Sequence, residues 1–360
     1  MRVVIAGGGT GGHVYPGIAV ARELRSRDAG MVVTFAGTTQ GLESRVVPRE
    51  GFDLDRLRSG GLKGKSVWDR LRGAWLVPVG LLDAWRILSR RRPDVVIGVG
   101  GYSSGPVVLV AALRGLPTMV LEQNAVPGLT NRLLARVVRA AAVTYESTVA
   151  WFGEKALVAG NPVRPEFGAI EPVNPDAAGP VQVLVFGGSL GAHAINRAMV
   201  EAVPVLAGSG VALRVTHQTG ERDVELVRNA YRGSSLEAVA EPFLYDMDRR
   251  MAAADLIVCR SGATTLAEVA AAGRAAILVP LPTATDDHQR RNAEAFSAGG
   301  AAEVVLQGDL TGQELAARIL RLAGDRPARM RMAAAARALA RPDAARVIVD
   351  RALALAGEAR

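Results

Sequence analysis

Short apolar runs rich in Val and Ile alternate with longer Ala-, Leu- and Arg-rich segments along the chain of 360 residues. This alternation predicts parallel sheets whose two faces are both covered by helices. The pattern therefore predicts an α/β protein made of two doubly wound units. Strands are expected at residues 2–6, 31–36, 94–99, 118–121 and 141–144 in the first half, and at 181–186, 212–216, 255–259, 275–279 and 302–305 in the second.

The alternation stops near the middle of the chain, at residues 161–165 (NPVRP). Closely spaced prolines favour an extended chain, and a loop continues at residues 172–180. A chain of this length is too long for one ordinary core, so two domains are expected. We place the first domain at residues 1–162 and the second at 163–342, where a further break precedes a final helical segment.

The chain is basic, with a formal net charge of +8, and only three of its 43 basic residues are lysine. A basic surface suits anionic partners such as nucleotides, diphosphates, nucleic acid or an anionic membrane leaflet. Aromatic residues make up only 4% of the chain and no nucleic-acid-binding module is recognisable, which argues against nucleic acid. The uncharged window at residues 95–113 has glycines and a proline in its middle, so we expect strand, loop and helix there rather than a transmembrane helix.

Two glycine-rich loops follow the strands that begin the two halves. Residues 7–13 (GGGTGGH) follow the first strand, and residues 187–193 (GGSLGAH) follow the strand at 181–186. Consecutive glycines let main-chain N–H groups approach a phosphate, and the amino end of the following helix favours negative charge. Each loop therefore predicts a phosphate-binding site, although a tight strand–helix turn alone would also require such glycines.

The first loop matches the dinucleotide fingerprint at Gly7, Gly9 and Gly12. That fingerprint also requires an acidic residue at the end of the second strand, to bind a ribose hydroxyl. Here the second strand ends in residues 35–40 (FAGTTQ), and the first acidic residue is Glu43, beyond the turn. A nicotinamide-dependent oxidoreductase is therefore disfavoured, and no cofactor is expected.

Two candidate bases lie in the first half. His13 stands at the start of the first helix, whose dipole disfavours an imidazolium, so a neutral His13 could accept a proton. A histidine that only hydrogen-bonds the loop is the alternative. Glu122, Gln123 and Asn124 follow the fourth strand and could bind sugar hydroxyls, with Glu122 as the second candidate base. Turn capping is the alternative interpretation of this triplet.

In the second half, residues 260–268 (RSGATTLAE) form a strand–loop–helix junction. In one interpretation the loop amides hold a diphosphate and Glu268 binds a ribose diol. In the other, Thr265 and Glu268 form a capping box. The acidic residues 286–287 beside His288 have no second cluster with ligand spacing, so no protein-bound metal is expected.

The segment at residues 67–92 combines tryptophan, leucine and arginine, as an interfacial membrane patch does. An amphipathic helix packed on its own domain is the alternative interpretation. Pro78 and Gly80 are expected to break or kink the segment. The candidate membrane patch consists of Trp68, Trp75, Leu82 and Trp85.

Together the motifs resemble those of the MurG family of bacterial peptidoglycan glycosyltransferases. The resemblance covers nearly the whole chain, and the motifs occur in the family's order. Each motif alone would be weak evidence, but together they are highly specific. They are residues 8–17 (GGTGGHVYPG), 100–106 (GGYSSGP), 122–124 (EQN), 160–164 (GNPVR), 187–192 (GGSLGA), 259–263 (CRSGA), Glu268 and 288–293 (HQRRNA).

The resemblance implies a GT-B fold with two Rossmann-like domains, and a final helix at about residues 343–360 that packs back onto the first domain. It implies an inverting transfer of GlcNAc from UDP-GlcNAc to the muramyl 4-hydroxyl of undecaprenyl-diphosphoryl-MurNAc-pentapeptide (lipid I), which gives lipid II. The C-terminal domain would hold the nucleotide sugar. The N-terminal domain would hold the acceptor, as part of a peripheral protein on anionic lipids at the cytoplasmic face of the bacterial membrane.

The resemblance also implies roles for single residues. The acceptor side would include Gly9, Tyr102 and Ser103. The UDP-GlcNAc contacts would be Thr10, Gly11, Gly12, Asn124, Arg164, Ser189, the main chain at Phe243 and Leu244 for uracil, Ala263 and Thr264 for the diphosphate, Glu268 for the ribose, and Gln289 and Asn292 for GlcNAc.

The chain departs from the family's pattern at Leu121, where a histidine is usual. The base therefore falls to His13 or Glu122, and we favour His13. The alternative function is that of another GT-B transferase acting on a different lipid acceptor. A non-catalytic nucleotide-sugar-binding module is disfavoured because both glycine loops are intact.

Overall fold

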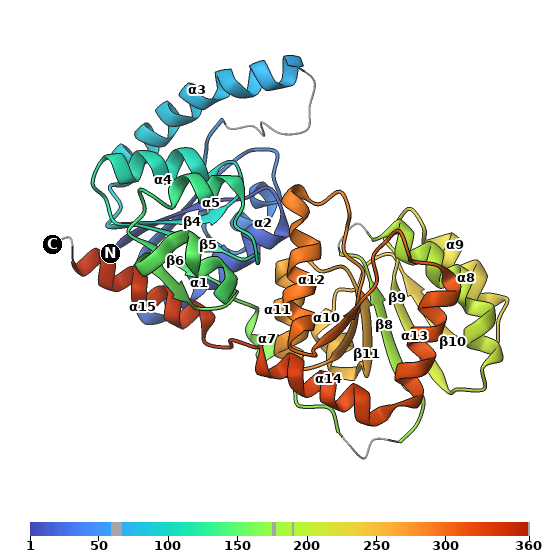
Figure 1. The fold of residues 1–360 in the computed structure, drawn as a ribbon. Coiled ribbons are helices and arrows are strands. Elements are labelled where there is room, and N and C mark those ends of the chain that lie inside the picture. The colour runs from blue at the N-terminus through green and yellow to red at the C-terminus, as the bar shows by residue number, and fades with distance from the viewer. Residues whose placement is uncertain (59–66, 175–177, 189–190, 359–360) are drawn as a thin grey trace. The chain divides into compact units, whose positions relative to one another are not determined.

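The computed structural model describes residues 1–58, 67–174, 178–188 and 191–358, and for residues 67–76 the backbone alone. The described chain divides into two compact units (Figure 1). The first unit contains Met1–Arg164 and Arg341–Arg360, and the second contains Pro165–Ala340. These boundaries lie two residues from those expected from the sequence, and they make Arg164 the last residue before the second unit.

The first unit is built on a parallel sheet with seven described strands in the order β3-β2-β1-β4-β5-β6-β7. The strands are β1 (Arg2–Gly7), β2 (Val32–Gly37), β3 (Asp53–Arg56), β4 (Val95–Gly100), β5 (Thr118–Glu122), β6 (Ala140–Val143) and β7 (Ala156–Val158). The helices are α1 (Gly11–Arg27), α2 (Glu43–Arg49), α3 (Val67–Arg91), α4 (Ser104–Leu113), α5 (Leu129–Leu134), α6 (Val149–Phe152) and α15 (Ala344–Gly357).

Successive residues of the central strand β1 enter two different cores, because side chains alternate between the faces of a sheet. Val3 and Ile5 pack in one core with residues of α1 and α15. Val4 and Ala6 pack in the other core with residues of α3 and α4. The C-terminal helix α15, red in Figure 1, is thus part of the first unit.

The second unit repeats the arrangement with six described parallel strands in the order β10-β9-β8-β11-β12-β13. The strands are β8 (Val181–Phe186), β9 (Leu213–Gln218), β10 (Glu237–Glu241), β11 (Leu256–Cys259), β12 (Ala275–Leu278) and β13 (Ala302–Val304). The helices are α7 (Pro165–Gly168), α8 (His193–Gly208), α9 (Val224–Arg232), α10 (Met247–Ala253), α11 (Ala263–Ala272), α12 (His288–Ala298), α13 (Gly312–Gly324) and α14 (Arg326–Ala338).

The helices of the first unit test two expectations, a break in the segment at residues 67–92 and the absence of a transmembrane helix at residues 95–113. Helix α3 runs without interruption through Pro78 and Gly80, so a break in this segment is wrong, and a kink at these residues stays a prediction. Residues 95–113 form β4, a loop and α4, as the sequence predicted. Of the helices that the structure describes, none combines the length and the apolar character needed to cross a membrane.

Candidate active site

Most of the predicted site residues that the structure describes lie in the loops, or in the first two turns of the helices, that follow the carboxyl ends of the strands. In parallel α/β sheets, ligands bind at this edge, near the point where the strand order reverses. That point lies between β1 and β4 in the first unit and between β8 and β11 in the second. Each glycine loop follows the first strand of its unit, β1 or β8, and therefore stands at this point.

His13 lies in the first turn of α1, against the loop that follows β4. A Cβ atom on Gly100 would lie 2.7 Å from His13 Nδ1, and Gly100 has a φ of +96°, so this close approach requires glycine. The Gly8 N–H donates to the Gly100 carbonyl oxygen at 3.4 Å and joins the two loops. The half-buried ring stands near the amino end of a 17-residue helix, which favours neutral imidazole. This environment is suitable for a general base.

Glu122 is 2% exposed, and its carboxylate accepts four hydrogen bonds. Oε1 accepts from the main-chain N–H and the side-chain amide of Asn124, at 3.0 and 3.1 Å. Oε2 accepts from the Gly128 N–H at 3.1 Å and from Asn131 Nδ2 at 2.9 Å. Burial raises the pKa of Glu122, while these donors act in the opposite direction. Because both oxygens are engaged, the structure favours turn capping over a role as base, and Asn124 is part of that turn.

The other predicted residues of the first unit differ in their access to solvent. Tyr102 is 52% exposed, whereas the adjacent Ser103 is only 2% exposed. Thr10 is exposed, and Gly11 and Gly12 are half-buried. Tyr102 and the start of α1 are therefore accessible to a ligand, whereas the Ser103 side chain is not.

Gly9 is engaged by the protein itself. Its N–H donates to Glu43 Oε2 at 2.7 Å, and Glu43 is completely buried. Sequence reasoning noted Glu43 only as an acid too far along the chain to bind a ribose. Its contact with the loop is a property of the fold that no sequence spacing indicates.

In the second unit, the end of β9 and the residue after it contact the glycine loop that follows β8. Gln218 Nε2 donates to the Gly188 carbonyl oxygen at 2.9 Å. A Cβ atom on Gly191, which has a φ of +75°, would overlap the Thr219 carbonyl group. Ser189, the expected diphosphate contact, lies outside the described residues.

Hydrogen bonds connect the loops that follow β11 and β12. Ser261 Oγ donates to the Gln289 carbonyl oxygen at 2.7 Å, and Asn292 Nδ2 donates to the Ser261 carbonyl oxygen at 3.3 Å. Gln289 Oε1 accepts the Leu281 N–H at 3.0 Å. Asn292 is fully buried, so its role in this structure is to join α12 to the loop before α11.

Helix α11 begins at Ala263 with Gly262 as its N-cap, so the capping-box interpretation of Thr265 and Glu268 is wrong. Thr264 and Glu268 are four residues apart and half-buried, which places them on one face of the helix near its amino end. Leu244 is 5% exposed, whereas the adjacent Phe243 is 41% exposed.

A buried chain of hydrogen bonds, which sequence reasoning missed, lies behind the second glycine loop. Asn196 Nδ2 donates to the Thr219 carbonyl oxygen and to Asp223 Oδ2, both at 2.8 Å. An amide oxygen only accepts, so His217 Nε2, 3.0 Å from Asn196 Oδ1, must carry the ring proton. His217 Nδ1 then accepts from the Tyr231 hydroxyl at 2.9 Å. Burial lowers the pKa of His217 to about 3, which keeps the ring neutral.

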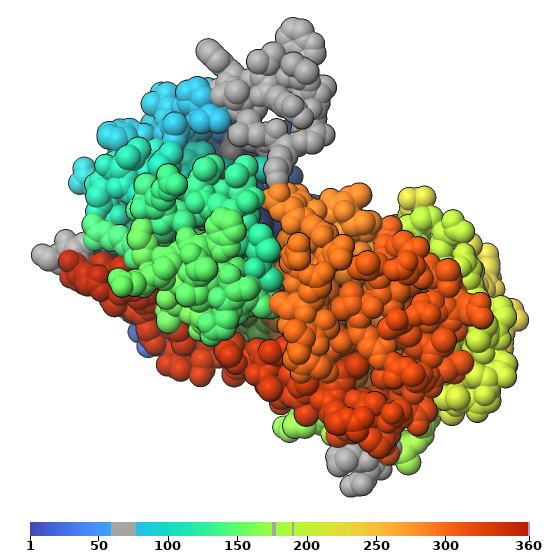
Figure 2. Space-filling view, viewed as in Figure 1, coloured from blue at the N-terminus to red at the C-terminus, as the bar shows by residue number. Residues whose placement is uncertain are grey.

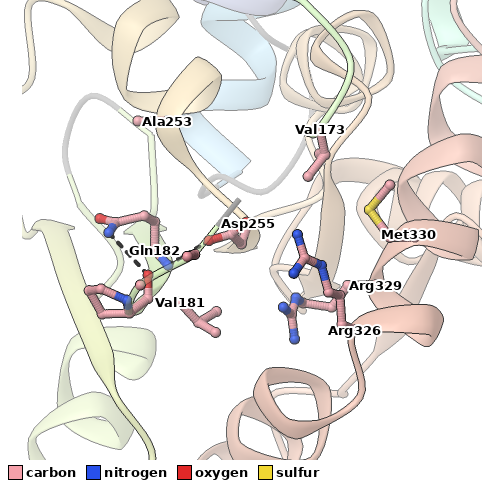
Figure 3. Close-up of a pocket in the computed structure, with 11 residues that line it drawn as sticks. Val173, Val181, Gln182, Ala253, Asp255, Arg326, Arg329 and Met330 are labelled. Carbon is pink, nitrogen blue, oxygen red and sulfur yellow. Dashed lines mark hydrogen bonds between the residues drawn. The ribbon is translucent and has the colours of Figure 1, made fainter. Parts of the chain in front are cut away.

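A cavity of about 210 Å³ in the second unit lies away from these loops (Figure 3). Val181 and Gln182 at the start of β8 and Asp255 before β11 line one side, and Arg326 and Arg329 of α14 line the other. This is the amino edge of the sheet, opposite the edge where ligands bind. Within the described part of the chain, no group of three or more His, Cys, Asp or Glu could hold a metal ion.

The chain matches the Glycosyltransferase family 28 N-terminal domain over residues 3–143 and the Glycosyltransferase family 28 C-terminal domain over residues 182–348. A curated relative in Pelobacter propionicus is 47% identical over 97% of this chain and 98% of the relative. Another, in Anaeromyxobacter sp. strain Fw109-5, is 49% identical over 97% of this chain and 92% of the relative. Each is called UDP-N-acetylglucosamine–N-acetylmuramyl-(pentapeptide) pyrophosphoryl-undecaprenol N-acetylglucosamine transferase.

The crystal structure of Acinetobacter baumannii MurG is similar to this structure with a TM-score of 0.82 and 33% identity. The similarity covers 98% of this chain and 99% of that chain. The two parallel sheets with helices on both faces are those of the two-domain GT-B fold. Because both family 28 domains are present and nearly half of its residues are identical to those of the relatives above, the chain belongs to the MurG family of glycosyltransferases.

Proposed function

We propose that this protein transfers GlcNAc from UDP-GlcNAc to the muramyl 4-hydroxyl of undecaprenyl-diphosphoryl-MurNAc-pentapeptide. The observation that carries the proposal is family membership over nearly the full chain, with relatives whose names state this transfer. The presence of His13 and the two glycine loops at the ligand-binding edges of their sheets supports it.

The second unit is proposed to bind the donor. The start of α11 at Ala263 and Thr264 and the loop of Ser189 would hold the diphosphate, because helix amino ends and glycine-loop amides attract phosphate. Glu268, one turn into α11, would accept hydrogen bonds from the ribose. The main chain at Phe243 and Leu244 would meet uracil, and the region of Gln289 and Asn292 would lie near GlcNAc. Arg164, the last residue of the first unit before the second begins, would lie on the nucleotide side.

The first unit is proposed to bind the acceptor and to supply the base. Neutral His13 would take the proton of the muramyl 4-hydroxyl as its oxygen attacks the anomeric carbon of GlcNAc from the face opposite UDP. The bond from the anomeric carbon to UDP then breaks, and UDP leaves with the electron pair, so the configuration inverts. Main-chain N–H groups would neutralise the charge that develops on UDP. Gly9, Tyr102 and Ser103 form the proposed acceptor edge. Thr10, Gly11 and Gly12, which precede His13, are the UDP-GlcNAc contacts proposed for this loop.

We propose a peripheral association with anionic lipids at the cytoplasmic face of the membrane, through α3. Leu82 and Trp85 are 48% and 52% exposed, and the Arg114 guanidinium lies 4.8 Å from the centre of the Trp85 ring. The light-blue surface of α3 adjoins the teal surface of α4 in Figure 2. Leu113, the last residue of α4, is 75% exposed. The side chains of Trp68 and Trp75, the other members of the expected patch, lie outside the described residues.

Vesicle flotation tests the membrane surface. Replacing Leu82 and Trp85 together by serine should weaken binding to vesicles with anionic lipid about tenfold or more, because both exposed side chains lose their apolar contact with lipid. Val239→Ser, at a residue of the second unit that is 52% exposed, is the control and should bind as the wild type does. Equal binding of all three proteins would contradict the proposed surface.

The reaction is tested by UDP release from UDP-GlcNAc, with and without a short-chain lipid I analogue. Acceptor-dependent release together with the disaccharide product is the expected result. Binding of UDP-GlcNAc without release in the presence of this acceptor would contradict the proposed acceptor, and would favour a family-related transferase with a different lipid substrate.

A further inference from the structure

Glu43 fills a space beside the first glycine loop. It is the first residue of α2 and is completely buried. Its Oε2 accepts the Gly9 N–H at 2.7 Å, and its Oε1 accepts the N–H and the hydroxyl of Thr38 at 2.9 and 2.8 Å. A carboxylate therefore lies between the loops that follow β1 and β2, just before the amino end of α1.

Three glycines surround this carboxylate, and we call Gly8, Gly37 and Gly41 the glycine cradle. A Cβ atom on Gly37 would lie 2.7 Å from Glu43 Cγ. Cβ atoms on Gly8 or Gly41 would overlap the carboxyl group itself. Gly41 does not have a positive φ, so its glycine is required by space rather than by backbone conformation. The cradle is thus shaped around one small anionic group.

The donors to this carboxylate are those that usually bind phosphate. They are two main-chain N–H groups and a hydroxyl, next to the start of a 17-residue helix, and none is a Lys or Arg side chain. Main-chain N–H groups at a strand–helix loop, together with the helix dipole, form the anion site of nucleotide-binding α/β units. In this chain the anion in that position is supplied by the protein.

We propose that Glu43 is an internal anion that takes the place of a ligand phosphate in the first glycine loop. It fills the space beside the loop and accepts the Gly9 N–H, so this one N–H group is not available to a ligand. It also holds the loop that leads to His13, so Glu43 is a positioning residue that acts through Gly9. Only the effect on His13 rests on the proposed function.

The glycine cradle can be emptied and refilled. Glu43→Ala removes the carboxylate and leaves its three donors in place. Without the anion the loop before His13 is free to move, so kcat should fall about 10–100-fold. Formate, a free carboxylate, should then restore part of kcat. It should also raise the Tm of Glu43→Ala by about 2 °C or more relative to sodium chloride of equal ionic strength, because it binds the folded state only. The wild type should show neither effect.

Glu43→Gln tests whether the negative charge of Glu43 is needed in addition to its volume. The amide keeps the cradle filled but points an N–H group at donors, so kcat should fall about tenfold while KM for UDP-GlcNAc stays within about twofold. Formate should not rescue this variant. Glu50→Gln, at the far end of the same helix, where Glu50 pairs with Arg22 on the surface, is the matched control and should behave as the wild type does.

A folded Glu43→Ala variant whose kcat and Tm are indifferent to formate would overturn the proposal. If that variant does not fold, Glu43→Gln decides, and a raised KM for UDP-GlcNAc with kcat unchanged would overturn it as well. Wild-type protein that does not transfer GlcNAc would refute only the proposed function, because the formate-dependent change in Tm needs neither donor nor acceptor.

Discussion

The two glycine loops occupy equivalent positions in two similar units, but in the described part of the chain a buried acidic residue hydrogen-bonds to the main chain of the first loop only. In the first unit, Glu43 at the start of the helix after β2 reaches into the loop and accepts the Gly9 N–H. In the second unit, Asp223 at the start of the helix after β9 is held by Asn196 Nδ2 at 2.8 Å and by His193 Nδ1 at 3.0 Å. The second loop is bound instead through a carbonyl oxygen, that of Gly188.

This difference indicates how one architecture, used twice, can serve two kinds of ligand. A support that uses an N–H group of the loop removes a donor that would bind phosphate. A support that uses a carbonyl oxygen leaves the N–H groups for a ligand. The first loop is then suited to carrying a reactive side chain, and the second is suited to holding a diphosphate.

The largest expected effect comes from His13→Ala, which tests whether the first loop carries the chemistry. Loss of the base should lower kcat about 10²–10⁴-fold, while KM for UDP-GlcNAc stays within about twofold because the second unit binds the donor. Steady-state UDP release measures both constants. Tyr15→Phe, which changes an exposed ring on the same helix, is the control. If His13→Ala has a kcat close to that of the wild type, the general base does not lie in the first loop.

Asn196→Ala tests the support of the second loop. It leaves the His217 Nε2–H and the Thr219 carbonyl group without partners in the interior, so the free energy of unfolding should fall by about 2–4 kcal/mol. Chemical denaturation measures this change. Asn229→Ala, on the exposed face of α9, should change it by less than about 0.5 kcal/mol. A small effect at both positions would mean that the buried chain does not support the loop.

Gly41→Ala tests whether the first loop is shaped around the Glu43 carboxylate. Its methyl group would overlap Glu43 without straining the backbone. The free energy of unfolding should fall by about 1–3 kcal/mol. In a Glu43→Ala background, the same substitution should cost much less, since the overlap is gone. Gly208→Ala, where a methyl group would meet nothing within 4 Å, should be neutral or stabilising. If Gly41→Ala lowers the free energy of unfolding equally in the wild type and in Glu43→Ala, glycine at position 41 is not required by the Glu43 carboxylate.

The smallest effect is a pH dependence of stability that arises from His217 in the second unit. The pKa of His217 is about 3 in the folded protein, against a usual value of 6.5. Between these two pH values the unfolded chain binds a proton at His217 that the folded protein does not bind. The stabilisation is fully present above pH 6.5 and is lost as the pH falls from 6.5 towards 3. Between pH 6 and 5, the free energy of unfolding should fall by about 1 kcal/mol more in the wild type than in His217→Gln.

Glutamine can donate to Asn196 and accept from Tyr231, as the neutral ring does, but it does not titrate. Unfolding curves at several pH values compare the two proteins. Parallel pH profiles for wild type and His217→Gln would show that this ring does not remain neutral in the folded state.

Sequence patterns predict the buried strands of both units to within two residues at each end, because apolar runs mark strands that are covered on both faces. The strands that were missed, β3, β7 and β10, lie at sheet edges. They read DLDR, ALV and EAVAE, with at most three consecutive apolar residues each. An edge strand needs fewer buried side chains, so its apolar pattern is weaker than that of a central strand, although the fourth edge strand, β13, was predicted.

The site was predicted as a set of loops, but the residues that shape the loops were not. Residue types at the end of β5 indicated a polar cluster, yet turn capping and catalysis use the same types there, and only the burial of Glu122 distinguishes them. Glu43 meets Gly9 across 34 positions of sequence, and Asn196 meets His217 across 21. Such contacts arise from how neighbouring βα units pack, which periodicity within one segment does not report.

Helix α15 has a consequence for the order in which the protein is made. Its residues Ile348, Val349 and Leu355 complete the core that contains Val3 and Ile5 of the first strand. Domains generally fold as units while the ribosome is still adding residues. The second unit is one continuous stretch of chain and can fold during synthesis, but one core of the first unit stays open until residue 355 has been added. The half of the molecule that is synthesised first is therefore the half that is completed last.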